Sequence, residues 1–339
     1  MKHPALKASC VASFFLTALL TCLFPSCKTI RPDAGELPVT AFVDPFIGTD
    51  FHGHTFPGAC LPFGMVQLSP DTRTMGWDGC SGYHASDSTI LGFSHTHLSG
   101  TGIGDYGDVL FLPYSGEAQL EPGEEDRPDS GYRSRFDKTS ETAKPGFYAV
   151  HLTDDDIAVE LTATQRAGFH RYVFGKAGRS GVLVDLVHTI HGGGQPLHEI
   201  VVINDREIQG LKYSSGWARN QYVYFTAQFS KPFEISIFQN DSLVAQGPPS
   251  PDPKIPGTQT PGTETPDSET PGALVRGTRL KALLEFDTEP GEVLLVKVGL
   301  SATGYDGSRN NLASEIPGWD FEAVKMQAQR TWENQLNRV

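Results

Sequence analysis

Short runs in which apolar and polar residues alternate occupy this sequence from about residue 41 to residue 303, and they constrain its fold more than any other feature. Alternation with a period of two turns one side of an extended strand towards a core and the other towards solvent. The clearest runs are residues 146–152, 157–164, 221–229, 233–238, 280–286 and 292–300. About a dozen such candidates are separated by turn residues, with almost no helical periodicity between them. The pattern predicts a mainly β protein, an antiparallel β-sandwich, and it argues against a parallel α/β sheet.

Length and charge limit the class of partner. The chain has 339 residues, which suffices for one large domain or two ordinary ones without a disulfide framework. It carries 27 Lys and Arg against 40 Asp and Glu, a formal net charge of −13. Proteins that bind nucleic acid present a basic face to the phosphate backbone. The charge therefore argues against nucleic acid and is compatible with a neutral polar ligand or one bridged by a metal cation.

The first residues have the pattern of a targeting signal. A positively charged start precedes an apolar run at 11–24, and the residues that end at Cys27 resemble a bacterial lipoprotein cleavage box. We therefore predict a signal peptide at 1–26, lipidation of Cys27 and a tether at 27–40, and the alternative is an ordinary secretory peptide. Lipidation would place the chain in a bacterial cell envelope, in the periplasm or on the outer-membrane surface, with a lipid as its only contact with the membrane.

A proline-rich segment interrupts the strand pattern. Residues 247–272 hold eight prolines, four of which recur at a period of five among Thr, Gly and Glu. Proline removes backbone donors, and Thr and Glu supply no core. We therefore expect a disordered insert at 247–272 within a sandwich domain that covers 41–303.

The end of the sequence has helical periodicity. Asp320 can cap a helix whose apolar residues recur at steps of three or four: Phe321, Val324, Ala328, Trp332 and Leu336. An apolar stripe needs a surface to cover it. We expect 304–339 to be a linker helix towards a further domain, with this stripe exposed and prone to aggregation in the isolated chain; the alternative is a helix that packs back on the sandwich.

Histidines concentrate between residues 44 and 108, which hold five of the eleven. The glycine-rich composition of this stretch predicts long loops over the sandwich, where binding groups tend to lie. The pairs His52/His54 and His95/His97 have a spacing found in some metal sites. The alternative is histidines that only form hydrogen bonds within the protein. We expect no metal ligand in this chain, and a metallohydrolase built on the two pairs is the hypothesis we favour least.

Trp77 and Asp78 suggest a different chemistry. An aromatic face can pack against the CH groups of a sugar while a neighbouring carboxylate accepts its hydroxyl protons. The alternative is a tryptophan that fills the core beneath a loop. Paired carboxylates could also act as general acid and base, with Asp78, Asp105 and Asp108 as candidates, although no local signal marks one of them.

Cys60 and Cys80 are the cysteines that remain beyond the predicted signal and lipidation site. They could form a disulfide in an oxidising compartment or remain free thiols. Neither has the Cys-x-x-Cys spacing of a zinc or redox site.

A set of ordered motifs resembles a known family. They are Val-Asp-Pro-Phe-Ile-Gly-Thr at 43–49, Thr-Phe-Pro-Gly-Ala at 55–59, the segment 62–71, Gly-Cys-Ser-Gly-Tyr-His at 79–84, the segments 92–102 and 104–108, Asn-Leu at 311–312 and Glu-Ile-Pro-Gly-Trp-Asp-Phe at 315–321. Together they are similar to the N-terminal domain of glycoside hydrolase family 92, the bacterial exo-acting α-mannosidases. The resemblance spans about residues 41–339, and its length makes it more specific than any single motif.

The resemblance implies a β-sandwich joined by helices to an (α/α)₆ barrel, with calcium-dependent hydrolysis that inverts the anomeric carbon. The sandwich would contribute loops to a mannose pocket, which Trp77 would line. By their place in the same loop, the other expected substrate-binding residues are Arg73, Asp78, Cys80, Ser81 and Tyr83.

In the family the catalytic Glu and Asp and the calcium carboxylates lie in the barrel, and no motif of this sequence matches them. We therefore expect no catalytic residue and no bound Ca²⁺ in this chain, which would be inactive alone. The expected partners are an α-mannoside oligosaccharide and a complementing barrel domain. The alternative is a non-catalytic, carbohydrate-binding surface lipoprotein.

Overall fold

The computed structural model describes residues 37–247 and 273–338. The predicted signal peptide, the lipidation of Cys27 and almost all of the proline-rich insert lie outside the described residues. Within them, no helix combines the length and the apolar character needed to cross a membrane.

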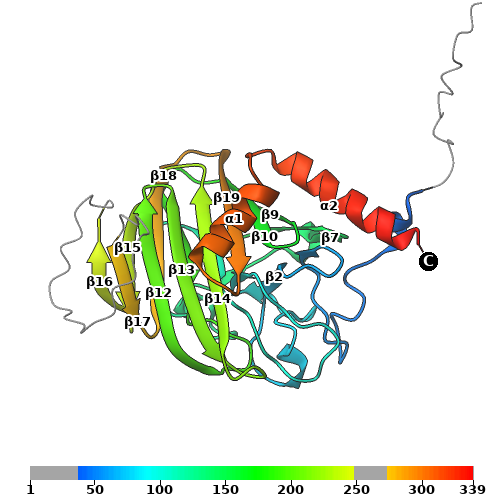
Figure 1. The fold of residues 1–339 in the computed structure, drawn as a ribbon, viewed down its shortest axis with the longest axis horizontal. Coiled ribbons are helices and arrows are strands. Elements are labelled where there is room, and N and C mark those ends of the chain that lie inside the picture. The colour runs from blue at the N-terminus through cyan, green and yellow to red at the C-terminus, as the bar shows by residue number, and fades with distance from the viewer. Residues whose placement is uncertain (1–36, 248–272, 339) are drawn as a thin grey trace, which may run out of the picture. The chain divides into compact units, whose positions relative to one another are not determined.

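Two antiparallel sheets form most of the described chain (Figure 1). The eight-stranded sheet has the order β1 (Ala59–Cys60), β2 (Gln67–Asp71), β4 (Gly92–Ser94), β5 (Leu110–Ser115), β11 (Gly178–Asp185), β18 (Leu280–Thr288), β15 (Glu234–Gln239) and β16 (Ser242–Gln246). The nine-stranded sheet has the order β17 (Ala273–Gly277), β12 (Gly194–Asn204), β13 (Glu207–Ser215), β14 (Gln221–Phe229), β19 (Glu292–Ser301), β10 (Ala167–Phe174), β9 (Ile157–Ala163), β8 (Phe147–Leu152) and β7 (Thr142–Lys144).

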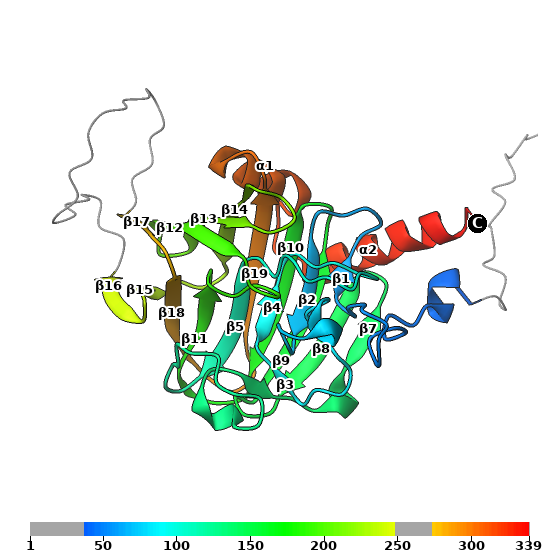
Figure 2. The ribbon, with the colours of Figure 1, turned by 90° about the horizontal axis from the view of Figure 1, so that it is seen from below.

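Short elements complete the fold. A small sheet pairs β3 (Thr89–Ile90) with β6 (Ser134–Arg135). The helices are η1 (Val39–Phe42), η2 (Trp77–Gly79), η3 (Pro128–Ser130), η4 (Lys138–Ser140), α1 (Tyr305–Glu315) and α2 (Phe321–Leu336). Figure 2 shows the two large sheets as layers, with α1 against the sheet that contains β14 and β19.

The sandwich predicted from the alternating runs is confirmed. In β9 the alternating residues Ile157, Val159 and Leu161 are fully buried between the sheets. They join one large apolar cluster with residues of the opposite sheet such as Phe93 and Phe111. Burying each large apolar side chain contributes about 1.5–3 kcal/mol, so this cluster is the main stabilising element of the fold.

The histidine-rich stretch does more than form loops. It contributes β1, β2 and β4 to the eight-stranded sheet and β3 to the small one. These strands are 2–5 residues long, which is too short to show an alternating pattern. The binding loops of this stretch are therefore fixed directly to the edge of the core.

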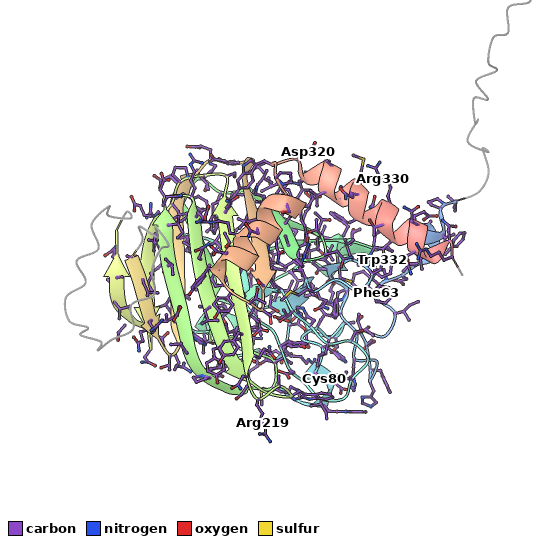
Figure 3. The ribbon with its side chains drawn as sticks, in the orientation of Figure 1. Phe63, Cys80, Arg219, Asp320, Arg330 and Trp332 are labelled. Carbon is purple, nitrogen blue, oxygen red and sulfur yellow. The ribbon has the colours of Figure 1, made fainter. Side chains whose placement is uncertain are left out.

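The C-terminal segment forms two helices where the sequence indicated one. The carboxylate of Asp320 accepts a hydrogen bond from the backbone N–H of Ala323 at 2.9 Å, which confirms the predicted N-cap of α2. Phe321 and Ala328 are buried, and the Trp332 indole donates to the carbonyl oxygen of Cys60 at 2.6 Å. In Figure 3, Trp332 lies on the side of α2 turned towards the strands and Arg330 on the other side.

The expectation that the apolar stripe of α2 lacks cover is therefore wrong. The helix packs on β8 and β9 of its own chain, and Val324 joins a small apolar cluster around Phe169. The physical reason is that the edge of the nine-stranded sheet offers an apolar surface that the sequence pattern of the helix alone does not reveal. That surface covers the buried face of the helix.

Candidate functional site

Trp77 begins the short helix η2, between β2 and β3, and the residue is 56% exposed. The residue before it, Gly76, has a φ of +82°, a conformation that residues with a side chain rarely adopt. The indole edge lies against Gly102, where an added Cβ would come within 2.6 Å of the Trp77 Nε1 atom. The structure therefore holds the ring in place and still presents it to solvent, so Trp77 does not fill the core.

Two imidazoles pack beside this indole. The ring centroid of His54 lies 4.6 Å from that of Trp77 in an edge-to-face arrangement, and the centroid of His52 lies 4.8 Å from it. Such contacts are each favourable and fix the ring orientation. The surface formed by Trp77, His52 and His54 therefore has little freedom to rearrange.

Asp78 is the polar centre of this surface. Its Oδ1 atom accepts hydrogen bonds from His52 Nδ1 at 2.7 Å and from His54 Nε2 at 3.3 Å. The hydrogen bond from His52 is the main reason that the pKa of the Asp78 carboxyl is lowered; burial opposes it, and the hydrogen bond from His54 adds to the lowering. Among the described residues no group binds the second oxygen, Oδ2, so an ionised acceptor atom remains free beside the indole.

A tight turn brings the two histidines to Asp78. A side chain at Gly53 would collide with the backbone of Gly48, only 2.1 Å from the added Cβ, so the turn closes only with glycine there. His54 has a left-handed backbone with a φ of +56°, and its carbonyl oxygen accepts a hydrogen bond from the N–H of Gly100 at 2.6 Å. The left-handed conformation is costly for a non-glycine residue, and the surrounding contacts hold it.

Arg73 connects the loop that precedes Trp77 to the segment at Ser86 and Asp87. Its guanidinium forms a bidentate pair with the buried carboxylate of Asp87, with Nε 2.8 Å from Oδ2. The Thr72 hydroxyl donates to the same carboxylate at 2.6 Å. A guanidinium paired in this way has few donors left for a ligand, so Arg73 positions the loop.

Cys80, Ser81 and Tyr83 lie beneath the surface and are 0–1% exposed. The Cys80 thiol donates to the carbonyl of Thr101 at 2.6 Å, and the Tyr83 hydroxyl donates to the carboxylate of Glu141 at 2.9 Å. Ser81 donates to backbone carbonyl oxygens. Protein groups thus occupy their polar atoms and shield them from solvent. Of the expected substrate contacts, the structure presents Trp77 to solvent and leaves Asp78 and Arg73 partly exposed, with side chains that are 31% and 27% exposed.

The sequence left open whether Cys60 and Cys80 form a disulfide, and in the structure both are free thiols. Cys60 lies at the end of β1, and burial raises the pKa of its thiol to about 11. Burial also raises the pKa of Cys80. Neither is therefore an activated nucleophile, because that requires a thiolate.

The imidazoles of the second pair, His95 and His97, bind different partners. His95 binds the carbonyl of Val109 through Nδ1 and His170 through Nε2, at 2.7 and 3.0 Å. His97 instead binds Asp71, with its Nε2 atom 2.7 Å from Oδ1. Both imidazoles are buried and contact different partners, so this pair does not converge on one point.

Sequence reasoning missed the partners of these histidines. His188 comes 117 positions after Asp71 in the chain and binds its Oδ2 atom at 2.7 Å. No local spacing could have indicated that contact, because only the pairing of β11 with β5 and β18 brings His188 there. The same holds for the Asp108–Lys212 ion pair, in which both side chains are fully buried.

The donor atoms near Trp77 do not suit calcium. Ca²⁺ is bound by six to eight oxygen ligands. His52, His54 and Asp78 form the one described cluster of three metal-binding side chains, and it offers a single carboxylate beside two nitrogens. We therefore derive no calcium-dependent step from these residues.

An exposed indole beside an ionised carboxylate, on a loop at the edge of a β-sandwich, is the kind of surface that carbohydrate-active proteins present to sugars. The family model for the glycosyl hydrolase family 92 N-terminal domain matches residues 42–301 of the chain. The chain therefore belongs to glycoside hydrolase family 92.

Solved structures agree with this assignment. The chain is similar to the family GH92 α-mannosidase BT3965 from Bacteroides thetaiotaomicron in complex with mannoimidazole, with a TM-score of 0.79 and 37% identity over 89% of this chain and 37% of that chain. It is also similar to the inverting mannosidase BT2199 from the same organism, with a TM-score of 0.68 and 25% identity over 87% of this chain and 36% of that chain.

A sequence relative is also described as a glycosidase. An uncharacterized secreted glycosidase of Arthroderma benhamiae is 27% identical over 90% of this chain and 39% of its own length. The chain thus spans little more than a third of the proteins to which it is similar.

Proposed function

We propose that this chain is the substrate-facing β-sandwich part of an α-mannosidase and that Trp77 and Asp78 bind a mannosyl residue. The observation that carries the proposal is the exposed indole with the free, ionised Oδ2 of Asp78 beside it. The indole would pack against the sugar's CH groups while Asp78 accepts a hydroxyl proton. The similarity to an α-mannosidase solved with mannoimidazole supports mannose as the sugar.

Hydrolysis in this proposal is carried out by a barrel domain that the chain complements. A general acid needs a carboxyl with a raised pKa, and the pKa of Asp78 is lowered, so Asp78 does not suit that role. Because the resemblance places the catalytic Glu and Asp in the barrel, the 339 residues would bind α-mannosides without cleaving them. As the resemblance implies, cleavage by the complete assembly would invert the anomeric carbon and use Ca²⁺ held outside the described residues.

Exposed apolar side chains on the loops around Trp77 support a protein partner. Phe51, Met75 and Ile103 are each more than half exposed, and the ring of Phe51 lies 5.0 Å from that of His52. Large apolar groups gathered near a polar site are typical of a contact surface. We propose that they meet the barrel domain, and that Cys27 carries the lipid that keeps the assembly at the cell envelope.

Titration of an α-mannobiose against the full chain tests the proposal. Trp77→Ala should weaken binding about tenfold, since stacking on an aromatic ring contributes on the order of 1 kcal/mol. Trp319→Ala is the matched control, because Trp319 is 40% exposed but packs beside Phe169 at the helices. Equal affinity in wild type and Trp77→Ala, or no binding in either, would remove the proposal.

The second candidate is a lipoprotein that captures mannosides without cleaving them in any assembly. The surface of Trp77, His52, His54 and Asp78, whose side chains contact one another within this chain, favours it. Micromolar affinity of the chain alone would support capture, whereas millimolar affinity would indicate one wall of a larger pocket. Release of mannose by the chain, abolished by a chelator, would contradict both candidates.

A further inference from the structure

Three potential metal ligands converge on one point beside Trp77. The donor atoms of His52, His54 and Asp78 all lie within 4.8 Å of one another, and no other described group of His, Cys, Asp and Glu does so. The Asp78 Oδ1 atom is 2.7 Å from His52 Nδ1 and 3.3 Å from His54 Nε2. In tetrahedral Zn²⁺ sites, metal–nitrogen bonds of about 2.0–2.1 Å set neighbouring donors about 3.3 Å apart. The separation to His54 already matches this spacing, and the separation to His52 needs to open by about 0.6 Å.

We propose that His52, His54 and Asp78 bind a divalent transition metal of the zinc class. Two imidazole nitrogens and one carboxylate oxygen are donors that such metals favour and that Ca²⁺ does not. Three protein ligands leave a fourth position for water or a ligand hydroxyl, as in sites that are not purely structural. The inference revises the expectation that this chain holds no metal ligand.

The surroundings preorganise these donors. His54 is buried and anchored through its carbonyl oxygen to Gly100, and the Trp77 ring packs against both imidazoles. The side chains of His52 and Asp78 are 55% and 31% exposed, so an ion has access from solvent. On binding, the metal takes the place of the hydrogens that now join the imidazoles to Asp78. Any imidazole nitrogen that carries such a hydrogen must release it, by loss to solvent or by a change of tautomer.

Titration of the full chain, prepared without a histidine tag, with Zn²⁺ in competition with a chromophoric chelator measures this site. We expect the wild type to bind one ion per chain at the site. The affinity of His52→Ala for Zn²⁺ should be lower by about 100-fold or more. His52→Gln keeps a hydrogen-bond donor for Asp78 but is a poor metal ligand, so it should lose affinity as well. The matched control is His151→Ala, because His151 is paired with Asp156 at 3.3 Å and has no second imidazole there.

Fluorescence locates the ion. Bound Cu²⁺ or Co²⁺ should quench Trp77, whose ring lies 4.6–4.8 Å from both imidazoles. Trp77→Phe should retain the affinity and lose this quenching. Equal Zn²⁺ affinity in wild type and His52→Ala, no bound Zn²⁺ in the wild type, or displacement of Zn²⁺ by equimolar Ca²⁺ would each overturn the assignment. None of these measurements uses a mannoside, so the result is independent of the proposed function.

Discussion

Two carboxylates in this protein each bind two imidazoles, with opposite consequences. In the exposed triad, His52 and His54 both bind Oδ1 of Asp78 and leave Oδ2 free. In the buried triad, formed by Asp71, His97 and His188, each oxygen of Asp71 takes one imidazole. The same three side chains thus form an accessible binding surface in one place and a saturated internal connection in the other.

The buried triad connects distant parts of the fold. It joins the end of β2 to the loop that follows β4 and to the loop that follows β11. Burial raises the pKa of the Asp71 carboxyl, but the charges and hydrogen bonds of His97 and His188 outweigh it, and the net shift is well below the ordinary value. The same residue types therefore form a binding group in one place and a structural group in the other. What differs is whether solvent reaches the carboxylate and whether one of its oxygens remains without an imidazole partner.

The largest effect should follow loss of the buried carboxylate. Asp71→Asn should lower the free energy of unfolding by about 3–5 kcal/mol, because it leaves two buried imidazoles without their charged acceptor. Asp78→Asn should leave the urea midpoint unchanged, since solvent reaches that site. Urea unfolding at neutral pH measures both variants, and comparable midpoints for the two would break the comparison.

A smaller effect should appear as a pH dependence. Burial lowers the pKa of His95 to about 4, whereas an unfolded histidine has a pKa of about 6.5. The unfolded chain therefore binds the proton more tightly, so this stability is complete above about pH 6.5 and is lost as the pH falls towards 4. The loss is on the order of 3 kcal/mol.

Variants separate this contribution from general acid sensitivity. His95→Gln should reduce the slope of unfolding free energy against pH between about 6.5 and 4, even though the variant is less stable overall, while other buried imidazoles such as His170 and His198, whose pKa burial also lowers, keep part of it. His52→Ala, which changes an exposed imidazole, should keep the slope of the wild type. A slope that His95→Gln leaves unchanged would show that burial of this imidazole does not control acid sensitivity.

The smallest effect concerns strain beside the exposed triad. Phe51 has a left-handed φ of +57° and is 78% exposed. Phe51→Asn should raise the free energy of unfolding by about 0.5 kcal/mol, because asparagine adopts this conformation more readily. Phe42→Asn is the control, since Phe42 is 74% exposed and has no positive φ. Thermal unfolding measures the stability of both variants. If Phe51→Asn is no more stable than Phe42→Asn, strain at Phe51 is not a property of this loop.

The sequence predicted the long strands and missed the short ones for one reason. β14 coincides with its predicted run at 221–229, because nine residues show the alternation clearly. β1 has two residues and β4 three, and their pairing depends on neighbours elsewhere in the chain. The contacts that cover α2 were missed in the same way, since β8 and β9 lie about 160–170 positions before the helix in the chain.

The sequence by itself determined the β-sandwich and the family and led to the proposal of Trp77 and Asp78 as sugar contacts, because periodicity and ordered motifs are local properties of the chain. Only the tertiary structure decided which histidine pair converges on a carboxylate and which is divided between separate partners. His52-x-His54 and His95-x-His97 have the same spacing, and a left-handed turn in one case and burial between sheets in the other give them different environments. Contacts between residues such as Asp71 and His188 arise from strand order, which no short stretch of sequence contains.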